Sequence, residues 1–337
     1  MRRKTLSVKI GQVNIGSDHS IKTQSMTTSS TMDTKKSVDE AIRIIKAGGK
    51  LVRFTAPNIN EAKNLLNIKK KLLNKGFSTP LVADIHFTPN AALEASKIVE
   101  KVRINPGNYV DKKKFEIKEY DEKSYQDEIV KIKEKFIPLI NSCKNNNVAM
   151  RIGTNHGSLS DRIMNRFGDT PLGMVESAME FLRICRENDY NQIVLSMKSS
   201  NPIVMIHAYR LLVKSMEDEN MHFPLHLGVT EAGDGLDGRI KSALGIGTLL
   251  SEGIGDTIRV SLTEDPEFEI PAAEKIIDKI NTIPEKVRLK NINKRAFSFS
   301  KRETFSIGSF SEKRTEMFFS PLSEALNKYG NSMSNKK

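Results

Sequence analysis

Between Ile21 and Leu262, short apolar runs rich in Val and Ile alternate with amphipathic stretches of helical period. This alternation is typical of repeated βα units, in which helices cover the faces of a parallel sheet. Eight units over about 240 residues predict an α/β protein, a (β/α)8 TIM barrel, in preference to a six-stranded dinucleotide fold. The predicted strands are IKTQSM from Ile21, LVRFTA from Leu51, PLVADIH from Pro80, KVRIN from Lys101, AMRIGT from Ala149, QIVLSMK from Gln192, PLHLGVT from Pro224 and DTIRVSL from Asp256.

Glycines and prolines mark the ends of the intervening helical stretches. Pro89, Pro171 and Pro202 stand where helices are predicted to begin, and Gly48 and Gly76 stand where helices are predicted to end. Two connections are long, from 108 to about 123 and from 155 to about 170. Both follow predicted strands and therefore belong to the catalytic face of a barrel, where the second is a candidate lid.

Polar side chains stand two positions apart at the ends of the predicted strands, as Arg103 and Asn105 do in KVRINPGNYV. Residues two apart share one face of a strand, and inward faces converge at the mouth of a barrel. We therefore expect these side chains to surround one site. The candidates are Arg53, Thr55, Asp84, His86, Arg103, Asn105, Arg151, Ser196, Lys198, His226, Thr230, Glu231, Arg259 and Ser261.

Cations outnumber anions among these candidates. Four arginines and Lys198 face two principal carboxylates, Asp84 and Glu231, so an empty mouth is predicted to be positive. Guanidinium forks bind phosphate oxygens bidentately, which favours a small ligand with two phosphates. Glu231 is a candidate proton donor, and His86 a candidate general acid or hydrogen-bond donor to substrate. Each cation could instead belong to an ion pair or the surface, and the histidines lack the spacing of metal ligands.

The net charge of +12 is distributed unevenly. From Asn281 onward, 12 Lys and Arg face 5 Glu, which leaves only +5 for the rest of the chain. We expect a barrel over 1–280 and a basic, partly irregular C-terminal extension over 281–337, possibly the beginning of an inserted domain. The extension has no aromatic-basic motif, so we do not expect nucleic acid as a partner.

The two cysteines, Cys143 and Cys185, lie 42 residues apart in helix-like stretches without a CxxC motif. They are expected to be buried, reduced thiols. The sequence contains no apolar run of the roughly 20 residues that a membrane span requires, and its start has no secretory signal. We therefore expect a cytoplasmic protein that makes no membrane contact.

Several long motifs occur in order along the chain: QSMT, PLVADIHF, VRINPGN, MRIGTNHGSLSDRI, GMVESA, SMKSSNP, LHLGVTEAGDG and GIGDTIRVSLT. Together they resemble hydroxymethylbutenyl diphosphate synthase over roughly residues 7–272. That family is an iron-sulfur oxidoreductase of the methylerythritol phosphate route to isoprenoids. The resemblance implies a TIM barrel that binds methylerythritol cyclodiphosphate, a small ligand with two phosphates.

The resemblance also implies roles for individual residues. It implies that the diphosphate is held by Arg53, Arg103, Arg151, Lys198, Arg259 and Ser261. It implies that the reacting end is lined by Asp84, His86, Asn105, Asn155 and Glu231, and Thr230 adds a further candidate contact.

The family holds a [4Fe-4S] cluster on three cysteines and a glutamate of a C-terminal domain and takes electrons from ferredoxin or flavodoxin. This chain has no cysteine after Cys185, and neither Cys143 nor Cys185 matches a cluster ligand. NHGSLSDRI and TEAGDGLDGRIKSA look most like the longer, plant-type branch. We therefore expect the substrate-binding part of a longer, dimerising enzyme, one that binds substrate but does not turn it over alone.

Two other functions remain open from the residues. One is another diphosphate-binding barrel, such as a dihydropteroate-synthase-like transferase, whose anion pocket would be similar and would need no iron. The other is a non-catalytic ligand-binding or RNA-binding protein, which only the basic extension and the missing cysteines favour.

Overall fold

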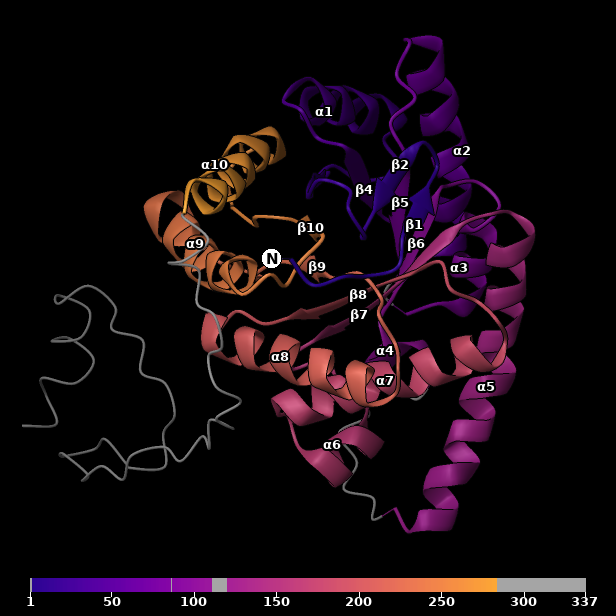
Figure 1. Cartoon of the computed structure of the whole chain (residues 1–337). Helices are drawn as coiled ribbons and strands as arrows, with labels where there is room; N and C mark the ends of the chain where they lie inside the picture. The colour runs from indigo at the N-terminus through magenta and orange to yellow at the C-terminus, as the bar shows by residue number, and fades with distance from the viewer. Residues whose placement is uncertain (1, 86, 111–119, 284–337) are drawn as a thin grey trace, which may run out of the picture. The chain divides into compact units, whose positions relative to one another are not determined.

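The computed structural model describes residues 2–85, 87–110 and 120–283, and its eight parallel strands form one sheet (Figure 1). Their order is β8-β7-β6-β5-β4-β3-β10-β9. A parallel bridge between Leu195 and Leu225 joins the two edges and closes the barrel. The (β/α)8 prediction is confirmed. The strands are β3 (Lys22–Met26), β4 (Leu51–Thr55), β5 (Leu81–Asp84), β6 (Lys101–Ile104), β7 (Ala149–Asn155), β8 (Ile193–Lys198), β9 (His226–Leu227) and β10 (Thr257–Ile258).

Helices follow the strands around the outside of the barrel (Figure 1). Pro89, Pro171 and Pro202 each occupy a first helical position, and Gly48 and Gly76 adopt positive φ angles just after helix ends, as predicted. The main helices are α1 (Thr34–Lys46), α2 (Ile59–Asn74), α3 (Pro89–Ala95), α5 (Glu122–Asn145), α7 (Pro171–Glu187), α8 (Pro202–Asp218), α9 (Gly235–Ser251) and α10 (Glu269–Thr282). Shorter elements are α4 (Pro106–Tyr109), α6 (Asp161–Phe167) and η1 (Pro266–Phe268).

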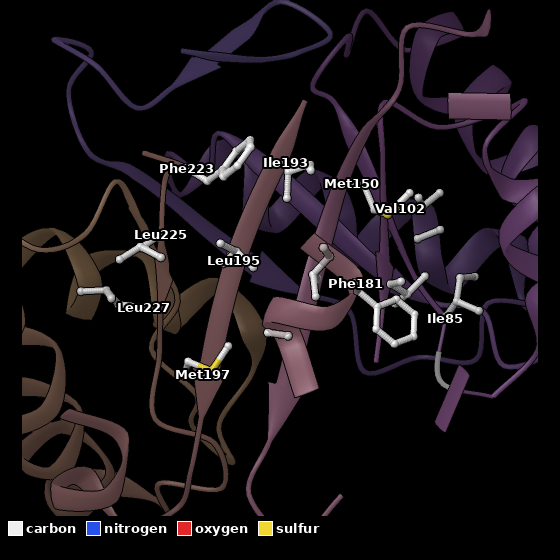
Figure 2. Packing of buried hydrophobic residues seen from close by; sticks show 14 of the residues in the cluster. Ile85, Val102, Met150, Phe181, Ile193, Leu195, Met197, Phe223, Leu225 and Leu227 are labelled. Atoms are coloured by element: carbon white, nitrogen blue, oxygen red, sulfur yellow. The ribbon is translucent and has the colours of Figure 1, made fainter. Parts of the chain in front are cut away.

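The sheet has a separate hydrophobic layer on each face. Outward residues such as Val102, Met150 and Leu195 pack against side chains of the helices, including Phe181 of α7 (Figure 2). Inward residues at the strands' amino ends pack against an N-terminal hairpin, β1 (Val8–Ile10) and β2 (Val13–Ile15). This hairpin plugs the bottom of the barrel. The periodicity does not predict it, because its strands are only three residues long.

The chain divides into two units, 1–290 and 291–337. The expected basic extension, apart from its first residues at the end of α10, lies outside the described residues and stays a prediction. Among the described residues, no helix is both long and apolar enough to cross a membrane.

A lysine occupies the barrel interior where branched apolar residues are usual. Lys101 lies two residues before Arg103 on β6, so both side chains face inward. Its side chain is fully buried, and Nζ has no hydrogen-bond partner among the described residues. Burial, with Arg151 and Arg53 nearby, holds the pKa of Lys101 well below its usual value. The lysine therefore destabilises the fold, because the unfolded chain binds the proton more readily.

We expect Lys101→Met to stabilise the protein by about 1–3 kcal/mol at pH 7 in urea unfolding, because a near-isosteric apolar side chain replaces an unpaired amine. Between the depressed folded pKa and about 10.4, the unfolded chain binds more protons, so the lysine's penalty shrinks as pH rises. The variant's advantage should accordingly be smaller at pH 10 than at pH 7. Lys97→Met is the matched control, since Lys97 is exposed and makes only a surface pair with Glu94. A Lys101→Met protein no more stable than the wild type would contradict this account.

Candidate functional site at the barrel mouth

The carboxyl ends of the strands surround a cavity of about 410 Å³. Hollows of about 540 and 430 Å³ lie elsewhere and also have charged residues in their linings, but the charged groups of the mouth cavity, such as Arg53, Arg103 and Arg151, are nearly fully buried. The predicted residues that line it are Arg53, Asp84, Arg103, Arg151, Asn155, Lys198, Thr230, Glu231, Arg259 and Ser261. Sequence reasoning missed the other lining residues, Met26, Ala232, Gly233, Leu262 and Thr263.

Strand register brings four of the predicted residues into one row. Thr55, Asp84, Arg103 and Arg151 are successive Cα partners across β4, β5, β6 and β7. Neighbours in a ladder place their side chains on the same face, so the row follows directly from the pairing of these strands. The register therefore brings polar residues from four separate sequence motifs together on one continuous surface.

Asp84 joins two of the cations. Its Oδ1 accepts a hydrogen bond from Arg103 Nη1 at 2.8 Å, and its Oδ2 lies 3.2 Å from Arg53 Nε. Arg103 also donates from Nη2 to the carbonyl of Gly153 at 2.9 Å. All three charged side chains are nearly fully buried. One carboxylate thus orients two guanidinium groups in a medium where unpaired charges are costly.

A third carboxylate, Glu269 at the start of α10, pairs with Arg259. Arg259 Nη2 and Nε donate to Oε1 at 2.7 Å and Oε2 at 2.9 Å, which forms a bidentate fork. Sequence reasoning missed Glu269, because it follows the last strand by more than ten residues and belongs to no strand end. Three of the five predicted cations therefore have carboxylate partners, and the empty mouth is less positive than predicted.

Arg151 and Lys198 have no carboxylate partner among the described residues. Arg151 Nη1 lies 3.4 Å from Ser196 Oγ and 3.2 Å from His226 Nδ1, both neutral acceptors. Lys198 Nζ makes no hydrogen bond or ion pair within the described part of the chain. Burial first, and then neighbouring arginines, lower the pKa of both Lys198 and Arg151 well below their usual values. An anion bound in the cavity would offset the repulsion among these cationic side chains.

Two inward glycines make room for these cations. A Cβ at Gly153 would lie 2.9 Å from Arg103 Nε, and a Cβ at Gly228 would lie 3.0 Å from Lys198 Nζ. Both distances are shorter than ordinary contacts, so any larger residue would displace the cation beside it. The inward residue at each of these positions is therefore a glycine, which leaves space for a long cationic side chain from a neighbouring strand.

Several polar atoms at the mouth are buried without a hydrogen-bond partner in the structure as described. They are Arg53 Nη1, Arg103 Nε and Asn155 Oδ1. Buried polar groups are nearly always paired, and exceptions are concentrated where a ligand or water completes them. Two donors and one acceptor thus remain for a ligand that has both anionic oxygens and hydroxyl groups.

Glu231 stands at the rim with an exposed side chain and a φ of 50°. A positive φ is unfavourable for a residue with a Cβ, and such strained residues cluster at functional sites. Glu231 lines the cavity directly after Thr230. This placement is compatible with the predicted proton donor, although the role itself stays a prediction.

Four of the described candidates do not line the cavity: Thr55, Asn105, Ser196 and His226. His226 does not line the cavity: it is fully buried beside Arg151, and its Nε2 has no described partner. Asn105 is also absent from the cavity wall, and its Oδ1 accepts from Gly107 N at 3.3 Å at the start of α4. His86 lies outside the described residues.

The candidate lid is anchored. Its helix α6 carries Arg162, which forms a bidentate pair with Glu180 of α7 at 2.7 Å for both bonds. Tyr125 of α5 donates to the same carboxylate, and the Arg162 guanidinium lies 4.4 Å from its ring centroid. Both charged groups are largely buried, so opening this segment would break a buried pair. These contacts hold α6 against α5 and α7.

Cys143 and Cys185 are fully buried among apolar residues behind the sheet. Burial raises the pKa of the Cys143 thiol to about 12 and that of Cys185 well above its usual value. Thiolates, which are the form that ligates iron, are therefore strongly disfavoured at both positions. The described residues contain no group of three or more His, Cys, Asp or Glu side chains placed to hold a metal ion.

A family model of the GcpE TIM-barrel domain matches residues 5–274. The chain belongs to this family. The match covers every strand of the barrel and Glu269, so the residues at the mouth all lie within the family domain. Membership of this GcpE family also agrees with the resemblance that the sequence motifs indicate.

Curated relatives in the GcpE family are named 4-hydroxy-3-methylbut-2-en-1-yl diphosphate synthase (flavodoxin). The protein of Parabacteroides distasonis is 61% identical over 280 residues, which are 83% of this chain and 46% of that protein. The protein of Leptospira interrogans is 53% identical over 309 residues, which are 92% of this chain and 46% of that protein. The chain therefore spans less than half the length of these relatives.

Solved structures resemble this GcpE-family barrel in fold alone. Dihydropteroate synthase from Xanthomonas albilineans in complex with 7,8-dihydropteroate has a TM-score of 0.52 at 8% identity and covers 83% of this chain and 100% of its own. The enzyme from Stenotrophomonas maltophilia has a TM-score of 0.52 at 9% identity, with 82% and 99% covered. Identities this low show a shared barrel and do not support the dihydropteroate-synthase-like alternative.

We expect Lys198→Met to change stability and diphosphate affinity in opposite directions. Removing a buried ammonium without a partner should raise the melting temperature. Loss of one charge-assisted contact should weaken pyrophosphate binding by roughly 10- to 100-fold in isothermal titration calorimetry. Lys214→Met, on the exposed surface of α8, should change neither quantity. Unchanged pyrophosphate affinity in Lys198→Met would remove Lys198 from the site.

Proposed function

We propose that this chain is the substrate-binding barrel of a hydroxymethylbutenyl diphosphate synthase. Its ligand would be 2-C-methyl-D-erythritol 2,4-cyclodiphosphate, which the whole enzyme opens reductively, with loss of water, to 4-hydroxy-3-methylbut-2-enyl diphosphate. The single observation that carries the proposal is the convergence of Arg53, Arg103, Arg151, Lys198 and Arg259 on one cavity inside the family domain.

The diphosphate would occupy the cationic part of the cavity. Arg103 and Arg53 are held by Asp84 and present unpaired N–H groups, while Arg151 and Lys198 supply charge that no described carboxylate balances. Charge-assisted N–H bonds to phosphate are strong in such a buried site, and little reorganisation is needed because the groups are already fixed. Arg259 and Ser261 complete this wall.

The carbon skeleton would face the opposite part of the cavity. Asn155 Oδ1 is an unpaired acceptor for a hydroxyl group, and Thr230 and Glu231 stand together on the same wall. Glu231 would transfer a proton to a departing oxygen. Asp84 and Asn105 would act here through the groups that they orient, and His86 remains a candidate from sequence alone.

The iron-sulfur cluster of the family does not fit the residues of this chain. A [4Fe-4S] cluster needs cysteine thiolates, and Cys143 and Cys185 are both buried with raised pKa values. We infer that the cluster ligands belong to another part of the enzyme, so that this barrel binds and orients substrate. The chain would be a fragment that is inactive without the cluster domain.

The remaining partners are part of the same proposal. The reductant would be flavodoxin, which the relatives' names include, or ferredoxin. Assembly as a homodimer and location in the cytoplasm are expectations from family resemblance and composition. The non-catalytic ligand-binding or RNA-binding alternative depends on the missing cysteines and on the basic extension, which lies outside the described residues from 284 onward.

Calorimetric titration of the purified chain tests the proposal directly. The cyclodiphosphate should bind with an affinity that falls as salt concentration rises, because charged groups dominate the contact. Pterin diphosphate should bind at least tenfold more weakly, since it lacks hydroxyls for Asn155. Equal or tighter binding of pterin diphosphate would favour the dihydropteroate-synthase-like function.

Reconstitution with iron and sulfide tests whether the barrel can work without the cluster domain. After incubation with iron, sulfide and reductant, the chain should remain colourless and show no turnover of cyclodiphosphate. Truncation after Thr282 should leave cyclodiphosphate affinity unchanged, because all lining residues precede it. A [4Fe-4S] absorption band accompanied by turnover would overturn the proposal that the cluster lies elsewhere.

A further inference from the structure

Glu269, a buried carboxylate near the mouth, accepts four hydrogen bonds. Its side chain is 1% exposed. Besides the two bonds from Arg259, its Oε2 accepts from Ser25 Oγ at 2.6 Å and its Oε1 accepts from Leu262 N at 3.2 Å. Both oxygens therefore have two donors each. A carboxylate bound so fully has little freedom to move or to take a proton.

Glu269 and its donors belong to three parts of the fold. Ser25 belongs to β3, Arg259 and Leu262 follow β10, and Glu269 itself begins α10. The carboxylate thus joins the two neighbouring strands β3 and β10 to the helix that follows them. This arrangement ties the Arg259 side chain and the backbone of Leu262 to α10.

The fork determines which part of Arg259 remains available. Glu269 takes Nε and Nη2, while Nη1 makes no hydrogen bond to any described residue. Arg259 lines the mouth cavity, so its available amino group can serve a ligand there. A guanidinium whose Nε edge is held by a buried carboxylate keeps one orientation, which lowers the entropy lost when ligand binds.

We infer that Glu269 is a positioning residue that aims Arg259 Nη1 at a phosphate of the ligand. The inference rests on the proposed function and deepens it. Glu269 stays paired with Arg259 when the ligand is bound, and the ligand uses the remaining N–H groups. A simple counter-ion would act in the opposite way, since its negative charge would only weaken anion binding.

The test compares Glu269→Gln with the wild-type chain by calorimetry, using inorganic pyrophosphate and the cyclodiphosphate. Glutamine keeps the shape and an acceptor for Ser25 but loses the charged fork. We expect affinity for both ligands to fall by about tenfold, although the mouth gains net positive charge. Tighter binding would show a counter-ion, and unchanged affinity with a lower melting temperature would show a scaffold role. Either result overturns the inference.

Glu267→Gln is the matched control. Glu267 lies two residues earlier and pairs with Arg43 at 2.7 Å, outside the cavity lining. The substitution makes the same change in net charge nearby without touching Arg259. Its pyrophosphate affinity should match the wild type or be slightly tighter. A fall equal to that of Glu269→Gln would mean that the effect is not specific to the fork.

A double-mutant cycle with Arg259→Lys isolates the pair. Lysine keeps the charge but cannot form a fork, so this variant should also lose about tenfold in pyrophosphate affinity. Adding Glu269→Gln to it should change affinity by less than threefold, because no fork remains to be positioned. Full additivity of the two losses would contradict the inference.

A readout without ligand separates this inference from the proposed function. In 15N–1H NMR spectra, the Arg259 Nε–H resonance should be protected from exchange in the wild type and lost or broadened in Glu269→Gln. An unprotected resonance in the wild type overturns the positioning role. If the chain binds pyrophosphate but not cyclodiphosphate, the proposed function fails while the pyrophosphate measurements still decide the role of Glu269.

Discussion

The site depends on how a barrel can hold five cations in one buried mouth. Like charges in a low-dielectric interior repel one another strongly, so each arginine needs a partner or a ligand. Asp84 supplies a partner for Arg53 and Arg103, and Glu269 supplies one for Arg259. Arg151 and Lys198 have no such partner among the described residues. The mouth is therefore organised without a ligand, and its residual positive charge is the part that would face the diphosphate under the proposed function.

This balance also explains departures from ideal barrel packing. Gly153 and Gly228 stand on inward faces where larger residues would displace Arg103 and Lys198. Below them, His226 accepts a hydrogen bond from Arg151, and burial beside Lys198 and Arg151 holds the pKa of His226 well below its usual value. A neutral imidazole at this depth can support Arg151 without adding positive charge. The interior of the barrel thus contains fewer apolar side chains than usual and has an oriented, electropositive cavity in their place.

The residues that stabilise the fold differ from the residues that line the mouth cavity. The outward faces of the strands and the helices form one apolar core, and the N-terminal hairpin closes the opposite end of the barrel. The pair of Arg162 and Glu180 holds α6 against α7. These features let the carboxyl ends of the strands carry buried charge, because the rest of the barrel supplies hydrophobic stabilisation.

The sequence by itself determined the barrel and most of the site. Alternation of apolar runs with amphipathic stretches has a direct physical cause in βα packing, and polar residues at strand ends must converge once the barrel closes. Nine of the strand-end candidates, among them Arg53, Asp84 and Lys198, line one cavity together with Asn155. Only the tertiary structure decided that His226 lies beneath the cavity, that Asn105 caps α4, and that Glu269 holds Arg259. These facts depend on side-chain reach across strands and on a helix that packs back against the mouth, and no local pattern encodes such distances.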